Sequence, residues 1–154
     1  MKSLYFLVKE KDVIFFAAAE APVKNENMLL NNLIMAKNMC EVLKKKKPSF
    51  FLYLSSDAVY SDTKKKIHED SLTVPDSLHG IMHLTREKMF ENLIKSKLCI
   101  VRPTLVYGDG DPHNGYGPNR FIRLIKEKEK ISLFGKGEEL RDHVWINDVS
   151  KAIS

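Results

Sequence analysis

The chain has 154 residues, 44% of them hydrophobic and 29% charged, and its formal net charge is +5. These proportions indicate one globular domain with a hydrophobic core. No apolar run approaches the roughly 18 residues that a membrane-spanning helix needs, so we expect no segment that crosses a membrane.

The N-terminal segment, "MKSLYFLVKEKD", lacks the pattern of a secretory signal, because charges follow a short apolar stretch at once. Cys40 and Cys99 lie in apolar contexts without a CxxC spacing, which is typical of buried, reduced thiols. We therefore expect a cytoplasmic protein.

Lysine supplies most of the positive charge, in two runs at residues 44–47 and 64–66. A nucleic-acid surface would interleave basic residues with arginine or aromatic side chains, and neither run does so. The first run follows a helix-like segment, where cations favour the C-terminal end of the helix dipole. We expect solvated surface here and no nucleic-acid partner.

The first predicted elements are two strands with a helix between them. Residues 12–19, "DVIFFAAA", form a continuous apolar run that predicts a strand buried on both faces. Residues 31–43 have apolar positions at helical spacing, and Pro48 ends that segment. Residues 50–56, "FFLYLSS", predict a second buried strand.

A polar loop then leads through Pro75 to a second predicted helix at residues 80–96, and residues 97–108 predict a third buried strand that runs into a loop. The remaining predicted elements are a Gly-, Asp- and Pro-rich loop at 109–118, a basic helix at 119–130, a short strand at 131–134 and a glycine turn at 135–137.

This alternation of strands and helices predicts an α/β fold with a parallel sheet. Ligands of such sheets bind at the carboxyl ends of the strands. We therefore expect the functional site near residues 17–19, 55–57 and 102–103.

Two histidines, His79 and His83, lie four residues apart on the first turns of the second predicted helix. This spacing places them on one helix face, as a zinc site requires, but "HGIMH" lacks the glutamate beside the first histidine of a zinc-protease helix. A third ligand would have to come from elsewhere, so we predict no metal. A structural role and a catalytic role both stay open.

The ordered motifs resemble those of the NAD-dependent epimerase/dehydratase family, the extended short-chain dehydrogenases that act on nucleotide sugars. Each motif alone is weak, and the resemblance depends on their order and spacing between residues 12 and 153. The motifs are "DVIFFAAA", the asparagine at position 32, "FLYLSSDAVY", "HED…P…LHGIMHLTRE", "IVRPTLVYGDGD" and "LRDHVWINDVSKAI".

The resemblance implies a Rossmann-like parallel sheet with flanking helices that is incomplete in this chain. Family members begin with a glycine-rich turn, whereas all seven glycines here lie at or after position 80. We expect residues 1–154 to form a single partial NAD(P)-binding domain, with the substrate-binding region starting in residues 109–147. The chain would then be a fragment covering the middle of the fold.

The resemblance also implies a catalytic set of Ser56, His79 and His83. In the family a tyrosine and, four residues later, a lysine begin this helix, and the spacing from Pro75 and Glu87 puts the two histidines at those positions. Ser56 matches the residue that hydrogen-bonds the sugar hydroxyl. A neutral imidazole is a competent base near pH 7, but protonating it beside a cationic nicotinamide is unfavourable. We expect reduced activity or a variant proton relay.

By position, the resemblance assigns the following residues to the cofactor: Ala17, Ala18, Asn32, Ser55, His83, Arg102 and Pro103. Plain alternatives remain: small residues also suit tight sheet packing, asparagine is common near helix starts, and a strand-end arginine can form a structural ion pair. Substrate contacts fall on Asp57, Asn119 and Arg141. A guanidinium suits bidentate phosphate contact, and a helix N-terminus such as that at Asn119 favours anions.

The implied function is that of an NAD-dependent nucleotide-sugar epimerase similar to UDP-glucose 4-epimerase, with NADP as the alternative cofactor. Transient oxidation would pass a hydride from a sugar carbon to NAD and back to the other face. The alternative is a non-catalytic binding or scaffold protein of the same fold that lost the Tyr/Lys pair. We expect a nucleotide-sugar partner, and either a homodimer or a second protein that supplies the missing half.

Overall fold

The structure is a computed structural model that describes residues 2–61, 66–111, 117–133, 135–137 and 140–154. It divides into two compact units, Met1–Arg102 and Pro103–Ser154, which are described separately. The boundary between the units lies just before the predicted substrate region at residues 109–147.

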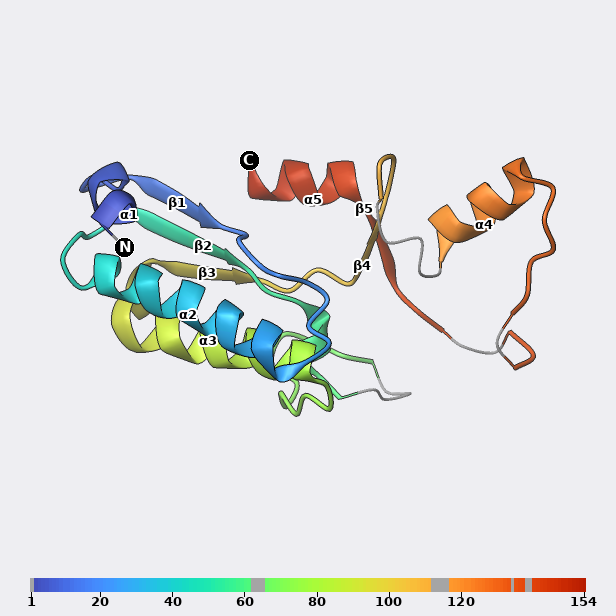
Figure 1. The fold of residues 1–154 in the computed structure, drawn as a ribbon, viewed down its shortest axis with the longest axis horizontal. Coiled ribbons are helices and arrows are strands. Elements are labelled where there is room, and N and C mark those ends of the chain that lie inside the picture. Colours follow the sequence, from blue (N-terminus) through green and yellow to red (C-terminus); the bar gives the residue numbers. More distant parts are fainter. Residues whose placement is uncertain (1, 62–65, 112–116, 134, 138–139) are drawn as a thin grey trace. The chain divides into compact units, whose positions relative to one another are not determined.

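The first unit is a three-stranded parallel sheet in the order β1-β2-β3, with two long helices (Figure 1). Its elements in chain order are α1 (Lys2–Leu7), β1 (Val13–Phe16), α2 (Glu26–Leu43), β2 (Phe50–Leu54), the short 3-10 helix η1 (Asp57–Val59), α3 (Leu78–Ile94), the 3-10 helix η2 (Lys95–Lys97) and β3 (Leu98–Val101). The predicted α/β alternation with a parallel sheet is confirmed.

Polar caps fix where the two long helices begin. The Asn25 side chain accepts a hydrogen bond from the Met28 amide at the start of α2, and the Ser77 hydroxyl does the same for the Gly80 amide at the start of α3. Each cap satisfies a backbone donor that has no partner within the helix. The cap at Asn25 starts α2 earlier than the apolar spacing alone predicts.

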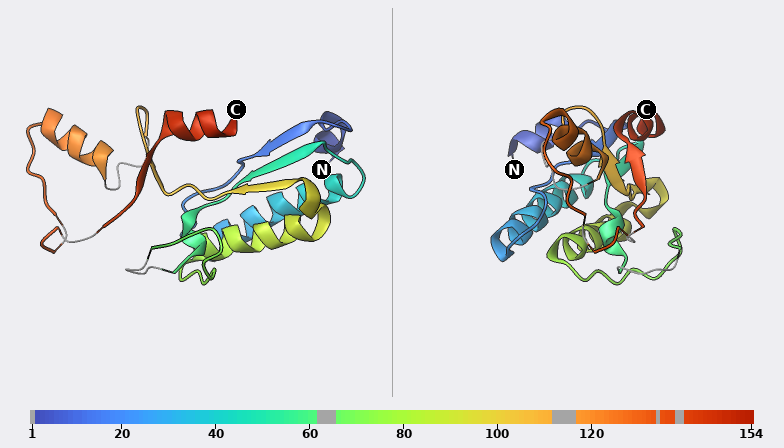
Figure 2. Two further views of the ribbon diagram at one scale, coloured as in Figure 1. Left: turned by 180° about the vertical axis from the view of Figure 1, so that it is seen from behind. Right: turned by 90° about the vertical axis from the view of Figure 1, so that its right-hand side faces the viewer.

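One face of the sheet carries the hydrophobic core, under α2 and α3 (Figures 1 and 2). Phe51 and Tyr53 of β2 are fully buried there and pack on Phe90 of α3, with ring centroids 4.9 and 5.3 Å from the Phe90 centroid. Because side chains alternate along a strand, the residues between them face the other way. The helices therefore cover only half of the strand residues.

The opposite face of the sheet carries exposed apolar side chains. Val13 is 72% exposed, Phe15 50% and Phe50 40%, and no helix among the described residues of the first unit lies on that face (Figure 2). The prediction that residues 12–19 form a strand buried on both faces is therefore wrong for β1. A continuous apolar run does not show how many of its faces are covered.

The second unit contains β4 (Leu105–Tyr107), α4 (Pro118–Lys126), β5 (His143–Trp145) and α5 (Ile146–Ile153), with β4 and β5 paired in parallel. Residues 97–108, predicted as a buried strand running into a loop, contain β3 and, after a break at residues 102–104, a further strand, β4, that belongs to a different sheet. Pro103 lies between them and has no amide hydrogen to donate to a ladder. The basic helix predicted at 119–130 is α4.

The short strand predicted at residues 131–134 is also wrong over the part that the structure describes. Residues 131–133 have no strand assignment, and Ile131 and Leu133 are 42% and 59% exposed. Without a neighbouring strand, an apolar run has no ladder to join. Position 134 lies outside the described residues. A turn does occur at residues 135–137, as predicted.

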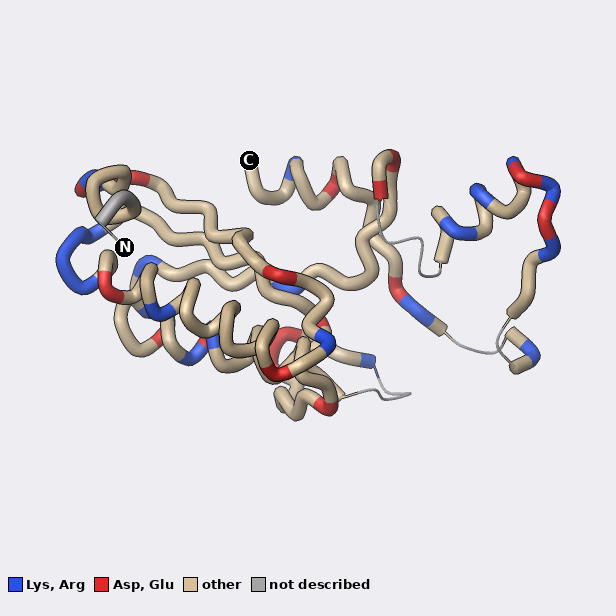
Figure 3. The backbone as a smooth tube through the Cα atoms, in the orientation of Figure 1, with Lys and Arg blue, Asp and Glu red and all other residues tan. Residues whose placement is uncertain are grey.

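The lysine run at residues 44–47 lies at the turn after α2 (Figure 3). Lys44 pairs with Glu41 at 2.7 Å, and the ammonium groups of Lys45 and Lys46 lie 5.8 and 4.9 Å from the Tyr5 ring centroid. Lys64 and Lys65 of the second run lie outside the described residues. Among the helices that the structure describes, none combines the length and apolar character needed to cross a membrane.

Candidate functional site

The polar residues of the first unit gather where β2 ends and α3 begins. Ser55 and Ser56 directly follow β2, and η1 carries Asp57. The first turn of α3 lies against η1, since a Cβ added to Gly80 would be 1.9 Å from the carbonyl oxygen of Ala58. Glycine at this position therefore brings the start of α3 close to the end of β2.

The two histidines lie side by side on α3. Their ring centroids are 4.7 Å apart in an edge-on arrangement. Nδ1 of His83 is 2.7 Å from the Tyr53 hydroxyl, and Nδ1 of His79 accepts a long hydrogen bond of 3.5 Å from the Val23 amide. The Tyr53 contact brings His83 to β2, the strand whose carboxyl end the sequence indicated as part of the functional site.

Burial keeps both rings neutral at pH 7. Burial lowers the pKa of His79, although the Asp57 carboxylate opposes this. Burial, together with the neighbouring His79 and the Arg86 guanidinium, lowers the pKa of His83 to about 3. Neither ring carries the permanent positive charge that the family's lysine would bring to this helix.

One nitrogen of His83 remains available to a ligand. Its Nε2 atom has no hydrogen-bond partner within the described residues. In that part of the chain, no buried side-chain nitrogen or oxygen lacks a partner. The Nε2 atom is therefore within reach of solvent, although the residue as a whole is only 5% exposed.

The two serines at the end of β2 have different environments. Ser55 is buried, and its hydroxyl donates to Oε1 of Glu87 at 2.6 Å. Ser56 is partly exposed; its hydroxyl donates to Asp57 at 3.2 Å and accepts from the Ala58 amide at 3.1 Å. Ser56 thus caps η1 while remaining reachable.

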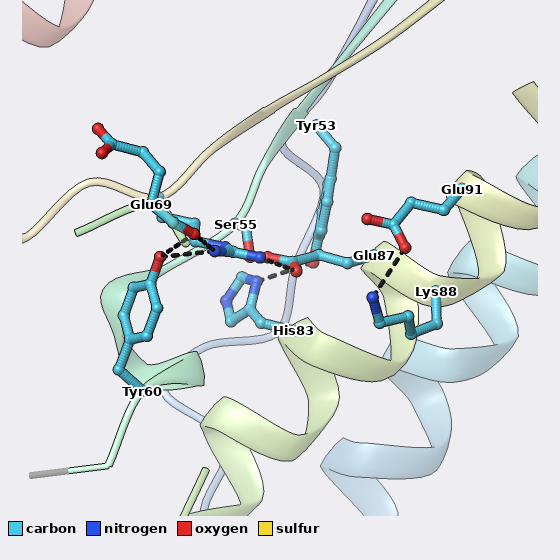
Figure 4. A network of polar contacts seen from close by, with 9 residues as sticks. Tyr53, Ser55, Tyr60, Glu69, His83, Glu87, Lys88 and Glu91 are labelled. Atoms are coloured by element: carbon cyan, nitrogen blue, oxygen red, sulfur yellow. Dashed lines mark hydrogen bonds and ion pairs between the residues drawn. The ribbon is translucent and has the colours of Figure 1, made fainter. Parts of the chain in front are cut away.

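A partly buried ion pair joins α3 to the end of β3 (Figure 4). Nε and Nη2 of Arg102 donate to the two carboxylate oxygens of Glu87 at 2.9 and 2.7 Å, and Nη1 donates to the Tyr60 hydroxyl at 2.6 Å and to the Glu69 carbonyl at 3.3 Å. All three guanidinium nitrogens of Arg102 have protein partners. This geometry supports the ion-pair alternative, and a cofactor contact for Arg102 stays an untested prediction.

A second cation, Arg86, connects α3 to α2 and to the segment after β1. It is fully buried and donates to the Asn32 carbonyl at 3.0 and 2.7 Å, to the Asn32 side chain at 3.0 Å and to the Ala18 carbonyl at 2.9 Å. Asn32 in turn donates to the Glu20 and Met28 carbonyls at 2.9 and 2.8 Å. Together the two side chains fix the segment that follows β1.

Ala17 and Ala18 lie in this fixed segment and are exposed. Tight packing within the sheet, the alternative explanation for their small size, therefore does not account for them. Their exposure at the carboxyl end of β1 leaves the cofactor prediction open.

The remaining predicted residues belong to the second unit. Asn119 donates to the Gly108 carbonyl at 2.9 Å and to Asp111 at 3.0 Å, so it ties α4 to the preceding loop. The Arg141 side chain is exposed, and its carbonyl accepts a hydrogen bond from His143 at 3.1 Å. A shallow hollow of about 280 Å³ is lined by residues 106–111 and Ile146. Pro103 begins this unit.

Three features of the first-unit site were not predicted from the sequence. They are Tyr53, Arg86 and the ion pair of Glu87 with Arg102. A signal for the two charged residues exists, because Met82 and Phe90 are buried and Arg86 lies midway between them on the same helical face. A charged residue in a buried stripe requires internal partners. No sequence pattern identified Tyr53 as the partner of His83.

No cluster of three or more potential metal ligands occurs within the described part of the chain. The paired imidazoles of His79 and His83 therefore have no third ligand among those residues.

A parallel sheet with polar side chains and a helix start at the carboxyl end of a strand is the arrangement of nucleotide-binding α/β proteins. The profile of the NAD-dependent epimerase/dehydratase family matches residues 5–154. The chain belongs to this family.

Relatives and solved structures agree with that assignment. The chain is 25% identical over 158 residues to the uncharacterized UDP-glucose epimerase YtcB of Bacillus subtilis, covering 96% of this chain and 49% of the relative. It is 28% identical over 156 residues to a putative UDP-glucose 4-epimerase of Methanocaldococcus jannaschii, covering 94% and 51%.

The structure of UDP-glucuronic acid 4-epimerase from Bacillus cereus in complex with NAD superposes with a TM-score of 0.84 at 26% identity, covering 97% of this chain and 50% of that one. The chain thus spans about half the length of the proteins it matches.

Proposed function

We propose that this chain forms part of an NAD-dependent UDP-sugar epimerase whose reacting groups are Ser56, His79 and His83. One observation carries the proposal: both histidines lie at the start of α3, where the spacing aligns them with the family's tyrosine and lysine, and His83 contacts β2 directly at 2.7 Å. Relatives named as UDP-sugar epimerases support the substrate class.

The residues fit the ribose end of NAD by their donor chemistry. Nε2 of His83 is reachable and unpartnered within the described residues, and the exposed Ala17 and Ala18 leave room beside the end of β1. The neutral N–H of His83 can donate to a ribose hydroxyl oxygen. The guanidinium groups of Arg86 and Arg102 already have protein partners, so they are not free to contact a pyrophosphate. NAD, when bound, would accept the hydride of the sugar carbon and return it.

The chain's own residues would position the sugar and move one proton. The Ser56 hydroxyl, held between Asp57 and the Ala58 amide, would orient the reacting hydroxyl group. His79 would take its proton at Nε2, which requires the tautomer that carries hydrogen on Nδ1. The 3.5 Å bond from Val23 opposes that tautomer weakly, because it is at the long limit for a hydrogen bond.

A second candidate, the non-catalytic binding protein, has its own supporting observation. Both histidines have a lowered pKa, and Nδ1 of His79 already accepts a hydrogen bond. A base of low pKa, locked as a hydrogen-bond donor toward the ligand, is poor at abstracting a proton. Such a site binds hydroxyl groups without oxidising them.

The two candidates differ in an assay of the purified protein with NAD and UDP-glucose. The epimerase predicts conversion to UDP-galactose that drops at least about tenfold in Ser56→Ala and in His79→Phe. It also predicts that the double substitution His79→Tyr and His83→Lys raises turnover. The binding protein predicts ligand binding without conversion in the unaltered protein. Conversion that is unaffected by Ser56→Ala and His79→Phe contradicts the proposed roles.

We also propose that the open sheet face is covered in the assembled protein, by a second copy or by another chain segment. The exposed Val13, Phe15 and Phe50 support this, because contiguous apolar surface of this kind is characteristic of contact surfaces. Size-exclusion chromatography with light scattering should give a dimer or higher species for the chain alone. A stable monomer contradicts the proposal.

A further inference from the structure

The direction of the hydrogen bond between Tyr53 and His83 is decided by burial. Tyr53 is fully buried, and the acceptor at hydrogen-bond distance from its hydroxyl is Nδ1 of His83 at 2.7 Å. Arg86 and Ser55 also interact with this hydroxyl, but the Arg86 guanidinium can only donate, and the Ser55 hydroxyl is engaged with Glu87. A buried O–H must donate to an acceptor, and a neutral imidazole nitrogen without hydrogen is such an acceptor. The hydroxyl therefore donates, and Nδ1 of His83 carries the lone pair.

Neighbouring charges exclude the protonated ring, in which both nitrogens would be donors. His83 is faced by Tyr53 from β2 and by His79 and Arg86 from α3, and within the described part of the chain no carboxylate contacts the ring. Burial raises the pKa of Tyr53, so the phenol remains a donor rather than a phenolate. A neutral ring with its lone pair on Nδ1 carries its hydrogen on Nε2.

We propose that Tyr53 is a positioning residue that fixes His83 as the Nε2–H tautomer, so that the ligand meets a neutral N–H donor at this position. The inference rests on the proposed function only for the identity of the ligand. The ligand atom that accepts from Nε2–H of His83 is a hydroxyl or carbonyl oxygen. The Nε2 atom is the reachable nitrogen of the ring. In place of a flexible cation, the helix therefore offers an uncharged donor of fixed direction.

The test is a long-range ¹H–¹⁵N correlation spectrum of the histidine side chains in the protein at pH 7.5, with His83 assigned from His83→Gln. We expect the pattern of a pure Nε2–H tautomer for His83. In Tyr53→Phe the donor to Nδ1 is removed, and we expect a mixture of tautomers. The matched control is Tyr60→Phe, which removes a phenol hydroxyl bound to Arg102 instead and should leave the His83 signals unchanged.

An Nδ1–H, mixed or protonated pattern in the unaltered protein overturns the inference, as does a pure Nε2–H pattern that survives in Tyr53→Phe. If Tyr53→Phe does not fold, a slowly exchanging Tyr53 hydroxyl proton with a nuclear Overhauser effect to the His83 ring decides in favour, and its absence decides against.

Titration with NAD separates this inference from the proposed function. A shift of the His83 Nε2–H signal on adding NAD supports both. The expected tautomer without any response to NAD supports the positioning role of Tyr53 and contradicts the proposed cofactor.

Discussion

Residues 2–102 and residues 103–154 both combine parallel strands with helices, but they differ in what those elements bury. Every buried side chain of the described residues, from Val8 to Phe90, belongs to the first unit. In the second unit no described residue is classed as buried, and Ile122 and Ile125 of α4 are 48% and 63% exposed. Regular backbone structure therefore does not by itself indicate a core.

The candidate site belongs to the unit that has the core, and its polar residues are part of that core. Arg86, Glu87 and Asn32 are fully buried and hydrogen-bonded, so they hold α2, α3 and the strand ends in one arrangement. Buried polar groups with full sets of partners favour one geometry, because any other leaves them unpaired. Substitutions in the first unit should consequently cost far more stability than those in the second.

The largest effect should come from Arg86→Met. The change leaves the carbonyls of Asn32 and Ala18 without their donor, and we expect a loss of about 3 kcal/mol in the free energy of unfolding. Urea unfolding followed by circular dichroism measures it. The control is Lys88→Met on the same helix, whose exposed pair with Glu91 should contribute less than about 0.5 kcal/mol. Equal losses in the two variants would contradict the role of Arg86.

The next effect compares glycines in the two units. Gly80→Ala would place a methyl group 1.9 Å from the Ala58 carbonyl oxygen, so α3 must move, and we expect a loss of about 2–3 kcal/mol. Gly110→Ala in the second unit meets no atom within 4 Å, and its cost is limited to the strain of a positive φ, about 1 kcal/mol. Thermal unfolding of both variants measures the two losses of stability. A larger loss in Gly110→Ala than in Gly80→Ala would contradict the tighter packing of the first unit.

A pH effect should also come from the first unit. The pKa of His83 is lowered to about 3 from its ordinary 6.5, so the unfolded chain binds a proton before the folded chain does. The folded state is therefore fully favoured above pH 6.5 and loses stability as the pH falls from 6.5 toward 3, by about 2 kcal/mol between pH 7 and pH 5. Urea midpoints at the two pH values measure this. His83→Gln should remove most of the difference, and an unchanged difference in that variant would argue against His83 as its source.

The smallest effect should come from the exposed face of α4. Ile125→Thr replaces a side chain that is 63% exposed, and we expect a change below about 0.5 kcal/mol. Met82→Thr, at a fully buried position of α3, is the matched change in the first unit and should cost at least about 2 kcal/mol. Similar losses for both positions would show that α4 is covered in solution.

The sequence predicted the three strands and the two long helices of the first unit from their apolar patterns, but it did not predict α1 or the two 3-10 helices. It did not predict the open face of β1, since a run such as "VIFF" is equally apolar whether one face or two are covered. It also did not predict that the chain beyond Pro103, which has no amide hydrogen for a ladder, forms a further strand, β4, in a different sheet.

The sequence placed the candidate site at the carboxyl ends of the strands, and the roles of its residues stay a prediction; the contacts within it were not predicted. The spacing of His79, His83 and Ser56 pointed to the end of β2, where the structure brings α3 and β2 together. The contact of His79 with Val23 joins residues 56 positions apart, and the Arg86 clamp reaches Ala18 across 68 positions. Contacts over such separations depend on the packing of α2 against α3, which local patterns do not encode.

The most direct test of a neutral histidine pair at this site is a pH titration of the His83 Cε1 proton by nuclear magnetic resonance between pH 8 and pH 4. The account predicts no protonation midpoint above about pH 5, because burial and Arg86 oppose a second positive charge. A midpoint near 6.5 would contradict it, since the ring would then be solvated and free of Tyr53.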